Sequence, residues 1–462
     1  MKIRLLLAIG FAFSILFFSQ KAFSQTDTTN TQQTIEDEPK PEHNKTKKGF
    51  SFAAIPALAY DTDLGFLYGV IGAVYHYGDG SNYPMYNHKV YMEWSRTTKG
   101  SGKNVFLYDN RTLIPNGRMN IEVSYLTEKA LDFYGFNGYN SYFGDQYLDS
   151  DNDDYISRLY YRHDRKLLRL KADFQGRLFS DNWRWLAGFV HYGIDVKSVD
   201  IAALNDGRDL EDMLPDTASI YDKYVEWGVI PEGQKAGGST NLLKLGVVFD
   251  NRDNEHSTTK GIWSEAIILS APGFIGNDYS YTKISLTHRQ YFNLYKKKVT
   301  FVYRLNYQGL IAGEIPFYMM PFYFRSTDTK DGLGGSKTLR GIKRNRVVGD
   351  GAVLGNIEFR YKFLETVLLN QNFSITLSAF SDAAQVVQMH AFDTDGVTAG
   401  YGNTRDENLK ELDYSKESMH ISYGFGLHFA LNHNFIVAVD YGMAANPQDG
   451  SSGLYIGLDY LF

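Results

Sequence analysis

Cysteine is absent from this chain of 462 residues. Its absence excludes a disulfide framework, thiolate catalysis, a thiolate zinc site and a lipid anchor on an N-terminal cysteine. Proline is scarce, with 11 residues, and charge is nearly balanced, with 47 Lys and Arg against 53 Asp and Glu. A net charge of −6 gives no reason to expect a nucleic-acid partner.

Long hydrophobic runs are also missing, except at the N-terminus. Lys2 and Arg4 precede an apolar stretch over residues 5–18, and Ala22 and Ser24 follow as small residues. This stretch is shorter than the roughly 20 residues that a spanning helix needs. We therefore interpret residues 1–24 as a signal peptide cleaved after Ser24. No later window approaches the length of a transmembrane helix.

Residues 25–48 contain Ile35 as their only large apolar side chain. Such a segment cannot bury enough surface to offset chain entropy, so we predict that it is disordered and periplasmic. An exported chain with no cysteine and no spanning helix is either a secreted β protein or a closed barrel that spans a membrane.

Aromatic residues and glycine are abundant, with 34 Tyr, 31 Phe and 43 Gly. From residue 50 onward the apolar residues alternate with small or polar ones. Between Ile421 and Leu431, for example, every odd position is apolar or aromatic and every even position is small, polar or Ala. This period of two is typical of β-strands with two different faces.

Sixteen alternating segments are predicted, at residues 52–60, 64–77, 87–97, 103–113, 118–127, 155–179, 183–198, 240–250, 259–271, 279–292, 298–311, 353–364, 372–388, 419–431, 434–443 and 453–462. A soluble sandwich would alternate as well. Aromatic residues near the strand ends and connections that alternate between short and long favour a membrane. We predict an all-β fold, a transmembrane antiparallel β-barrel of about 16 strands over residues 49–462. An even strand number places both termini in the periplasm of an outer-membrane protein.

Two of the long connections, residues 128–154 and 199–239, are strongly acidic. A solvated surface explains them better than divalent-cation binding, so we predict no metal site. The run from Asp250 to Glu255 lacks the spacing of a calcium loop and is interpreted as a turn held by Arg252. No nucleophile elbow, dinucleotide motif or P-loop is present, so neither a catalytic residue nor a cofactor is predicted.

The last segment places five apolar residues on one face and ends on an aromatic residue. This ending resembles the C-terminal signal by which outer-membrane barrels are recognised for assembly. The resemblance assigns that role to Leu458, Tyr460 and Phe462, and it implies the barrel assembly machinery as a partner during biogenesis.

A glycine-rich stretch at residues 334–342 is followed by further motifs at residues 355–360 and 380–385. With the turn at 250–261 and the stretch 133–136, these residues resemble the bacterial surface-antigen barrel family. That superfamily includes the BamA insertase, the TamA assembly factor and the two-partner secretion transporters. The resemblance runs from about Ile55 to Phe462.

The family's Val-Arg-Gly-aromatic loop motif corresponds to residues 339–342, of which Arg340 and Gly341 match. Its acidic partners correspond to Glu358 and Asp382. The resemblance implies that the sixth extracellular loop, residues 312–351, folds into the lumen and is locked there by Arg340. The chain departs from the family pattern by having Leu339, Ile342 and Ala384 in place of valine, an aromatic residue and glycine.

The strand pattern independently places Glu358 and Asp382 on lumenal faces of adjacent strands. A guanidinium on an inward-folded loop could bridge both carboxylates. From the residues alone, a second arrangement is equally consistent with the sequence. In it, Arg340 is exposed on the loop and the two acids line a water-filled pore. The other basic residues of this loop are Lys337, Lys343, Arg344 and Arg346. They are expected to pair with lumenal acids, such as Asp173, Asp250 and Asp440, rather than bind nucleic acid or lipopolysaccharide.

Members of this family that insert or translocate proteins usually carry periplasmic POTRA modules, which residues 25–48 are too few to form. We still predict a role in protein or lipid insertion or transport, with the Arg340 loop as plug or gate. The alternatives are a passive pore and an outer-membrane hydrolase. The expected partners are outer-membrane lipid and lipopolysaccharide, with a periplasmic partner or a lateral homodimer as further candidates.

Overall fold

The computed structural model describes residues 46–61, 65–368, 371–432 and 435–462. The predicted signal peptide and most of the predicted disordered segment lie outside the described residues. Sixteen strands form one antiparallel sheet in the order β1 to β11 and then β14 to β18. These strands are β1 (Phe50–Asp61), β2 (Gly65–His76), β3 (His88–Thr97), β4 (Gly102–Asn110), β5 (Gly117–Asp132), β6 (Arg162–Arg177), β7 (Trp183–Lys197), β8 (Gly237–Asp250), β9 (Gly261–Ala271), β10 (Tyr281–Tyr295), β11 (Val299–Gly313), β14 (Gly351–Leu368), β15 (Gln371–Gln388), β16 (His420–Leu431), β17 (Phe435–Ala444) and β18 (Ser452–Leu458).

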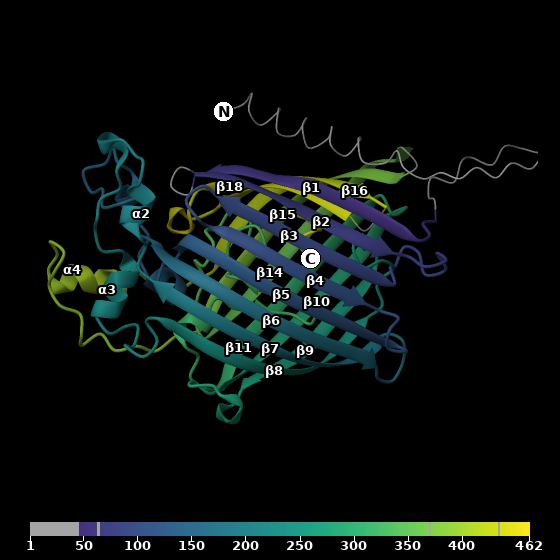
Figure 1. Ribbon diagram of the computed structural model, residues 1–462, viewed down its shortest axis with the longest axis horizontal. Coiled ribbons are helices and arrows are strands. Elements are labelled where there is room, and N and C mark those ends of the chain that lie inside the picture. Colours follow the sequence, from purple (N-terminus) through teal and green to yellow (C-terminus); the bar gives the residue numbers. More distant parts are fainter. Residues whose placement is uncertain (1–45, 62–64, 369–370, 433–434) are drawn as a thin grey trace, which may run out of the picture.

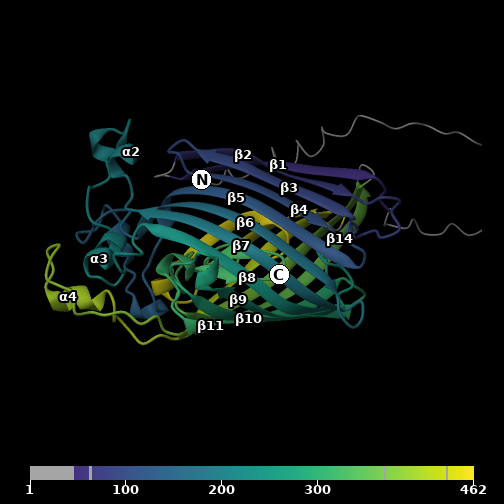
Figure 2. The same ribbon diagram turned by 60° about the horizontal axis from the view of Figure 1, so that its bottom comes forward.

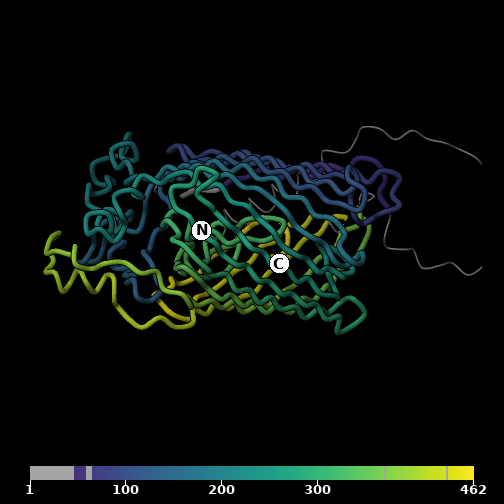
Figure 3. Tube along the Cα trace, turned by 90° about the horizontal axis from the view of Figure 1, so that it is seen from below, coloured from purple at the N-terminus to yellow at the C-terminus, as the bar shows by residue number. Residues whose placement is uncertain are grey.

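The sheet curls around a lumen, with tilted strands along its whole circumference (Figures 1 and 2). The long connections lie at one end, where they carry α2 (Ile201–Asn205), α3 (Ile220–Glu226) and α4 (Arg405–Lys410) (Figure 1). The tube view shows the same long loops extending beyond the strands at that end (Figure 3). Within the described ranges, every helix is too short or too polar to cross a lipid bilayer.

The two faces of the sheet differ in chemistry, as the period of two predicts. On β14, Ile357, Phe359 and Tyr361 are about half exposed on the outer face, whereas Glu358 and Arg360 are buried on the inner face. A soluble barrel would place its apolar residues inside, because water surrounds it. The apolar outer band and polar interior are those of a membrane-spanning β-barrel, which confirms the predicted fold class.

The long connections are more ordered than an alternation pattern can reveal. The segment before Arg162, which the sequence assigns to a strand from residue 155, belongs instead to a packed loop. Apolar residues, most of them aromatic, from three connections and from the loop before β14 form a buried cluster that we call the loop cap. It includes Phe133, Tyr134, Phe136, Tyr160, Tyr161, Tyr221, Tyr224, Trp227, Phe317 and Leu412.

The last strand ends earlier than predicted. β18 stops at Leu458, and Asp459 adopts a left-handed conformation with φ of 65°. Leu454 and Ile456 face outward and are about half exposed, as expected, but Phe462 is buried. The turn at Asp459 breaks the period of two, so the prediction that all five apolar residues share one face is wrong.

Candidate functional site

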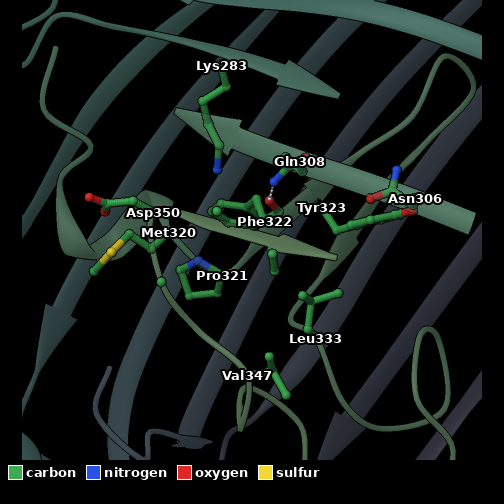
Figure 4. A pocket seen from close by; sticks show the side chains of 13 residues that line it. Lys283, Asn306, Gln308, Met320, Pro321, Phe322, Tyr323, Leu333, Val347 and Asp350 are labelled. Carbon is green, nitrogen blue, oxygen red and sulfur yellow. Dashed lines mark hydrogen bonds between the residues drawn. The ribbon is translucent and has the colours of Figure 1, made fainter. Parts of the chain in front are cut away.

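Loop six, residues 314–350 between β11 and β14, enters the barrel and lies against its inner wall. It forms a small hairpin of β12 (Phe322–Phe324) and β13 (Thr329–Asp331). The Gln308 amide on β11 fixes this hairpin, donating to the Phe322 carbonyl at 2.7 Å and accepting from the Phe324 N–H at 3.0 Å. Figure 4 shows this contact beside Lys283, in a cavity of about 20 Å³. Such a cavity has room for little more than one water molecule.

The tip of loop six is a tight turn built around Thr338. Its hydroxyl accepts the Gly334 N–H at 2.8 Å, while Gly335 donates its N–H to the Ile342 carbonyl at 2.7 Å. Gly334 and Gly335 have φ of 115° and 72°, values that side chains with a Cβ rarely adopt. The turn therefore requires glycine and presents residue 340 to the barrel wall.

Arg340 is fully buried and meets both predicted carboxylates. Its Nε and Nη2 donate to the two carboxylate oxygens of Asp382 on β15, at 3.0 and 3.1 Å. Its Nη1 lies 3.0 Å from Glu358 Oε2 on β14. The backbone N–H of Arg340 also donates to Asp382, at 3.0 Å. A bidentate contact of this kind fixes both the position and the orientation of the guanidinium.

Three further residues complete the surroundings of Arg340 but were not assigned to it from the sequence. The Phe380 ring lies below the guanidinium, 3.3 Å from its carbon. Asp440 on β17 is a third acid, 3.5 Å from Nη1. Asn356 donates to Asp382 at 2.8 Å and to the Thr338 carbonyl at 3.0 Å, so it joins strand and loop. The alternation pattern places all three in the lumen, but only folding brings them to one arginine.

Two glycines allow loop six to approach β17 closely. A Cβ on Gly341, whose φ is 96°, would lie 2.6 Å from the Met443 backbone nitrogen. A Cβ on Gly442 would lie 2.6 Å from the Arg340 carbonyl carbon. The Gly341 N–H donates to the Tyr455 hydroxyl on β18, at 3.0 Å. Backbone thus packs directly on backbone here, which no other residue type permits.

The residues that depart from the family pattern pack together. Leu339 and Ile342 are fully buried in a cluster that also contains Leu354, Ala384 and Val386 on β14 and β15. Burying two branched aliphatic side chains contributes roughly 1.5–3 kcal/mol each. The aliphatic side chains of loop six and the methyl group of Ala384 therefore form one apolar contact beside the charged one.

Two of the remaining basic residues of loop six pair with acids, but not with the three that the sequence suggested as examples. Arg344 binds Glu128 at 2.9 Å. Arg346 lies 3.8 Å from Asp449 and donates to three backbone carbonyls, of Gly138, Ser141 and Gln448. The acids proposed for them are engaged elsewhere: Asp173 with Lys244, Asp250 with Arg252, and Asp440 with Arg340 and His428. The three suggested acids are wrong for Arg344 and Arg346, because residues 343–348 lie near the loop cap, away from them.

The chain end lies inside the lumen next to the same strands. Arg360 donates to the Phe462 carbonyl at 3.1 Å and lies 3.9 Å from the centroid of the Tyr460 ring. The Phe462 ring packs with Tyr291 and Val302. Because Arg360 also binds Glu358, at 2.8 Å, the tail shares a carboxylate with Arg340. Of the predicted assembly residues, Leu458 is the last residue of β18 and Tyr460 and Phe462 follow the strand, and all three line a cavity inside the barrel.

The turn at residues 250–255 is held by contacts of Arg252. Arg252 donates to both oxygens of Asp250, at 2.8 and 3.1 Å, and to the Glu255 carbonyl, as expected for a held turn. In the part of the chain that the structure describes, no group of three or more His, Asp or Glu side chains is arranged to hold a metal ion.

Glu411 is a buried carboxylate within the loop cap, just after α4. It accepts from the Tyr160 hydroxyl at 3.3 Å, and that hydroxyl accepts from Lys223 on α3 at 3.0 Å. Burial raises the pKa of Glu411 to about 7, although Lys223 and Tyr160 act in the opposite direction. The folded cap thus holds a proton that the unfolded chain, with a pKa near 4.5, releases.

This shift predicts that the loop cap becomes less stable as pH rises. Protonated Glu411 stabilises the folded cap fully below pH 4.5, and this stabilisation is lost as pH rises to 7. The loss in the free energy of unfolding amounts to about 3 kcal/mol. Protease resistance of the cap should therefore be lower at pH 8 than at pH 5, and Glu411→Gln should remove the difference. Glu407→Gln, on an exposed carboxylate of α4, is the control and should leave the difference intact. An unchanged pH dependence in Glu411→Gln would contradict the assignment.

Comparisons with known proteins were consistent with this architecture. A family model described as the Omp85 superfamily domain matches residues 118–460. Among solved structures, CdiB from Escherichia coli is similar with a TM-score of 0.53 at 9% identity, over 89% of this chain and 62% of CdiB. BamA from Haemophilus ducreyi lacking POTRA domains 1–3 has a TM-score of 0.47 at 14% identity, over 89% of this chain and 69% of BamA. No curated protein sequence matches the chain.

Proposed function

The chain belongs to the Omp85 superfamily of outer-membrane barrels, and we propose that it assists insertion or transport of protein or lipid at the outer membrane. In this proposal loop six is a lumenal plug, and Arg340, Gly341, Glu358 and Asp382 form the lock that holds it. The observation that carries the proposal is the buried guanidinium bound to carboxylates on two adjacent strands.

A buried ion pair of this kind is a costly way to obtain stability alone. Removing the charges from water costs several kcal/mol for each ion, and a hydrophobic contact of equal volume would often be as stable. Charged groups instead specify one docking position, and they release the loop completely once the pairing is lost. These properties suit a plug or gate that can leave the lumen better than a loop that fills the lumen permanently.

The filled interior supports a plug over a passive pore. The cavities between loop six, the wall and the loop cap have volumes of about 20 Å³ each. A larger cavity of about 240 Å³ lies toward the short turns. Another, of about 460 Å³, is lined by residues of β10, β11, β14 and β15 that include the exposed Leu286 and Leu305, so it opens on the outer face. An open pore would need a continuous path for hydrated ions, which a loop packed against strands on opposite sides of the barrel obstructs.

The proposal includes an orientation and a set of partners. The loop cap faces the exterior, and both termini and the short turns face the periplasm. Outer-membrane lipid and lipopolysaccharide surround the apolar outer band, and the barrel assembly machinery installs the chain. A hydrolase is not proposed, because no residue cluster described above provides a nucleophile with its base and an oxyanion site.

Reconstitution in liposomes tests the proposal. Wild type is expected to accelerate insertion of an unfolded outer-membrane barrel or transfer of a labelled lipid, with low ion conductance. Arg340→Ala is expected to raise conductance and to alter the insertion or transfer rate. Liposomes that contain Arg344→Ala serve as the control, since that residue lies on the same loop but outside the lock. A large conductance that is equal in all three proteins would establish a passive pore instead.

The C-terminal residues give a separate prediction about assembly. Phe462→Ala is expected to reduce the yield of assembled barrel in cells several-fold, because it removes the aromatic end proposed as the assembly signal. The measurement is heat-modifiable gel mobility of outer-membrane fractions. Leu461→Ala is the neighbouring control. If the same loss occurs when purified chains refold in detergent, packing against Tyr291 and Val302 explains it and the signal does not.

A further inference from the structure

The cavity of about 240 Å³ lies inside the barrel near the short turns. Residues from the turns after β2 and β8, from loop six and from the chain end line it. Several lining residues are charged, and most of the carboxylates among them already bind a cation. Asp109 binds Arg118, Asp328 binds Arg325 and Lys330, and Asp440 binds Arg340.

Arg289 on β10 differs from these paired cations. It lines the cavity and is 7% exposed, yet no described carboxylate forms an ion pair with it. Its guanidinium contacts the Tyr291 hydroxyl, and its Nε has no hydrogen-bond partner. A buried guanidinium with an unused donor is costly unless something else occupies that donor.

Two more guanidiniums lie beside Arg289. The guanidinium carbons of Arg252 and Arg289 are 4.3 and 5.5 Å from the centroid of the Trp263 ring. Arg325 of loop six is within electrostatic range of Arg289. Contacts with the aromatic ring hold two of these three side chains in place, which reduces the entropy lost when a ligand binds.

The carboxylates that offset this charge are turned away or occupied. Asp250, which binds Arg252, does not line the cavity. Glu265 also lies outside its lining, and its Oε2 accepts from the Trp263 indole N–H at 3.2 Å and from the Ser326 N–H at 3.1 Å. Its Oε1 has no hydrogen-bond partner, and Glu265 is within electrostatic range of Arg289 without forming an ion pair with it. This wall of the cavity therefore presents three guanidiniums, of which Arg252 and Arg325 already donate to carboxylates and Arg289 does not. The acids of the cavity lining are Asp109, Glu255, Asp328, Asp440 and Asp459.

We propose that this wall is a binding site for a phosphoryl group. A phosphoryl group offers more anionic oxygens than a single carboxylate does, so it can accept hydrogen bonds from several planar guanidinium groups at once. The cavity is large enough for a phosphorylated headgroup or a small phosphate and too small for a folded segment. Because Arg325 belongs to loop six and Arg289 to β10, the bound group connects the plug to the barrel wall. This inference does not depend on the proposed insertion or transport activity.

Binding of inorganic pyrophosphate to the purified full-length barrel in detergent tests the site, by calorimetry and by thermal shift at constant ionic strength. Loss of charge-assisted hydrogen bonds in Arg289→Gln should weaken binding by about tenfold or more. Arg289→Lys keeps the charge without the planar donors and should bind with intermediate affinity. Arg177→Gln is the matched control, since Arg177 pairs with Asp181 on the exposed end of β6.

The source of the phosphoryl group is distinguished by a second arm, in which micelles contain phosphatidic acid or, as the uncharged counterpart, diacylglycerol. Stabilisation by phosphatidic acid alone identifies a lipid headgroup, and stabilisation by pyrophosphate alone identifies a soluble phosphate. Native heat-modifiable mobility of Arg289→Gln confirms that the variant is folded. The proposal is overturned if neither pyrophosphate nor phosphatidic acid raises the unfolding temperature. It is also overturned if the unfolding temperatures of wild type and Arg289→Gln rise equally.

Discussion

Arg340→Ala is expected to release loop six from the lumen. The substitution leaves Asp382 and Glu358 buried without their cation, and Asp440 loses one of its two partners. Breaking a buried ion pair by removing one partner costs about 3–5 kcal/mol. Limited proteolysis should therefore cut within residues 325–346 at sites that wild type protects, and single-channel conductance should rise.

The controls for this result separate charge from geometry. Arg340→Lys keeps the charge but cannot donate to both oxygens of Asp382 from a planar group, so it should only partly restore protection. Arg344→Ala removes a partly exposed partner of Glu128 and should cost less than about 1 kcal/mol. Full protection of loop six in Arg340→Ala would show that the apolar contacts of Leu339 and Ile342 suffice.

Gly341→Ala is expected to displace the same loop without altering any charge. Its Cβ would approach the Met443 backbone nitrogen to 2.6 Å, and its φ of 96° is unfavourable for alanine. Steric overlap and backbone strain together should cost about 2–4 kcal/mol. Proteolysis and conductance should change in the same direction as in Arg340→Ala, and the midpoint of thermal unfolding should fall.

Gly207→Ala separates the two causes, because residue 207 has a φ of 72° but a Cβ added there would meet no other atom within 4 Å. It measures strain alone, in a loop remote from the lumen. Gly442→Ala places a methyl group on the opposite side of the same contact and should reproduce the effect of Gly341→Ala. If Gly341→Ala and Gly207→Ala behave alike, the close approach of loop six to β17 is not essential.

Much of this architecture follows from the sequence, because a barrel strand has a simple signature. Alternation of apolar and polar residues located the sixteen strands to within a few residues, except at the end of β5, at the start of β6 and at the chain end. The same parity placed Glu358 and Asp382 on the lumenal face. These are local properties, since successive side chains on a strand point to opposite sides regardless of what surrounds them.

The partners of charged loop residues could not be predicted in this way. Arg340 and Arg346 are six residues apart, yet the first binds carboxylates of strands and the second binds loop carbonyls. Likewise, alternation predicted Phe462 on the same face as Leu454 and Ile456, but a left-handed residue at Asp459 breaks the alternation and Phe462 is buried. Neither the partners of these arginines nor the location of Phe462 can be predicted from alternation, because each depends on the path of a loop or chain end that has no regular repeat.

The sequence by itself determined that the chain is a membrane barrel with acids on two neighbouring lumenal strands. The period of two and the glycine-rich turn are local patterns, so they can be recognised from consecutive residues. Only the tertiary structure decided which cation those acids bind, that Asp440 joins them, and that Arg289 is left without a carboxylate among the described residues. The physical reason is distance: ion pairs and backbone contacts form across the lumen between residues far apart in the chain.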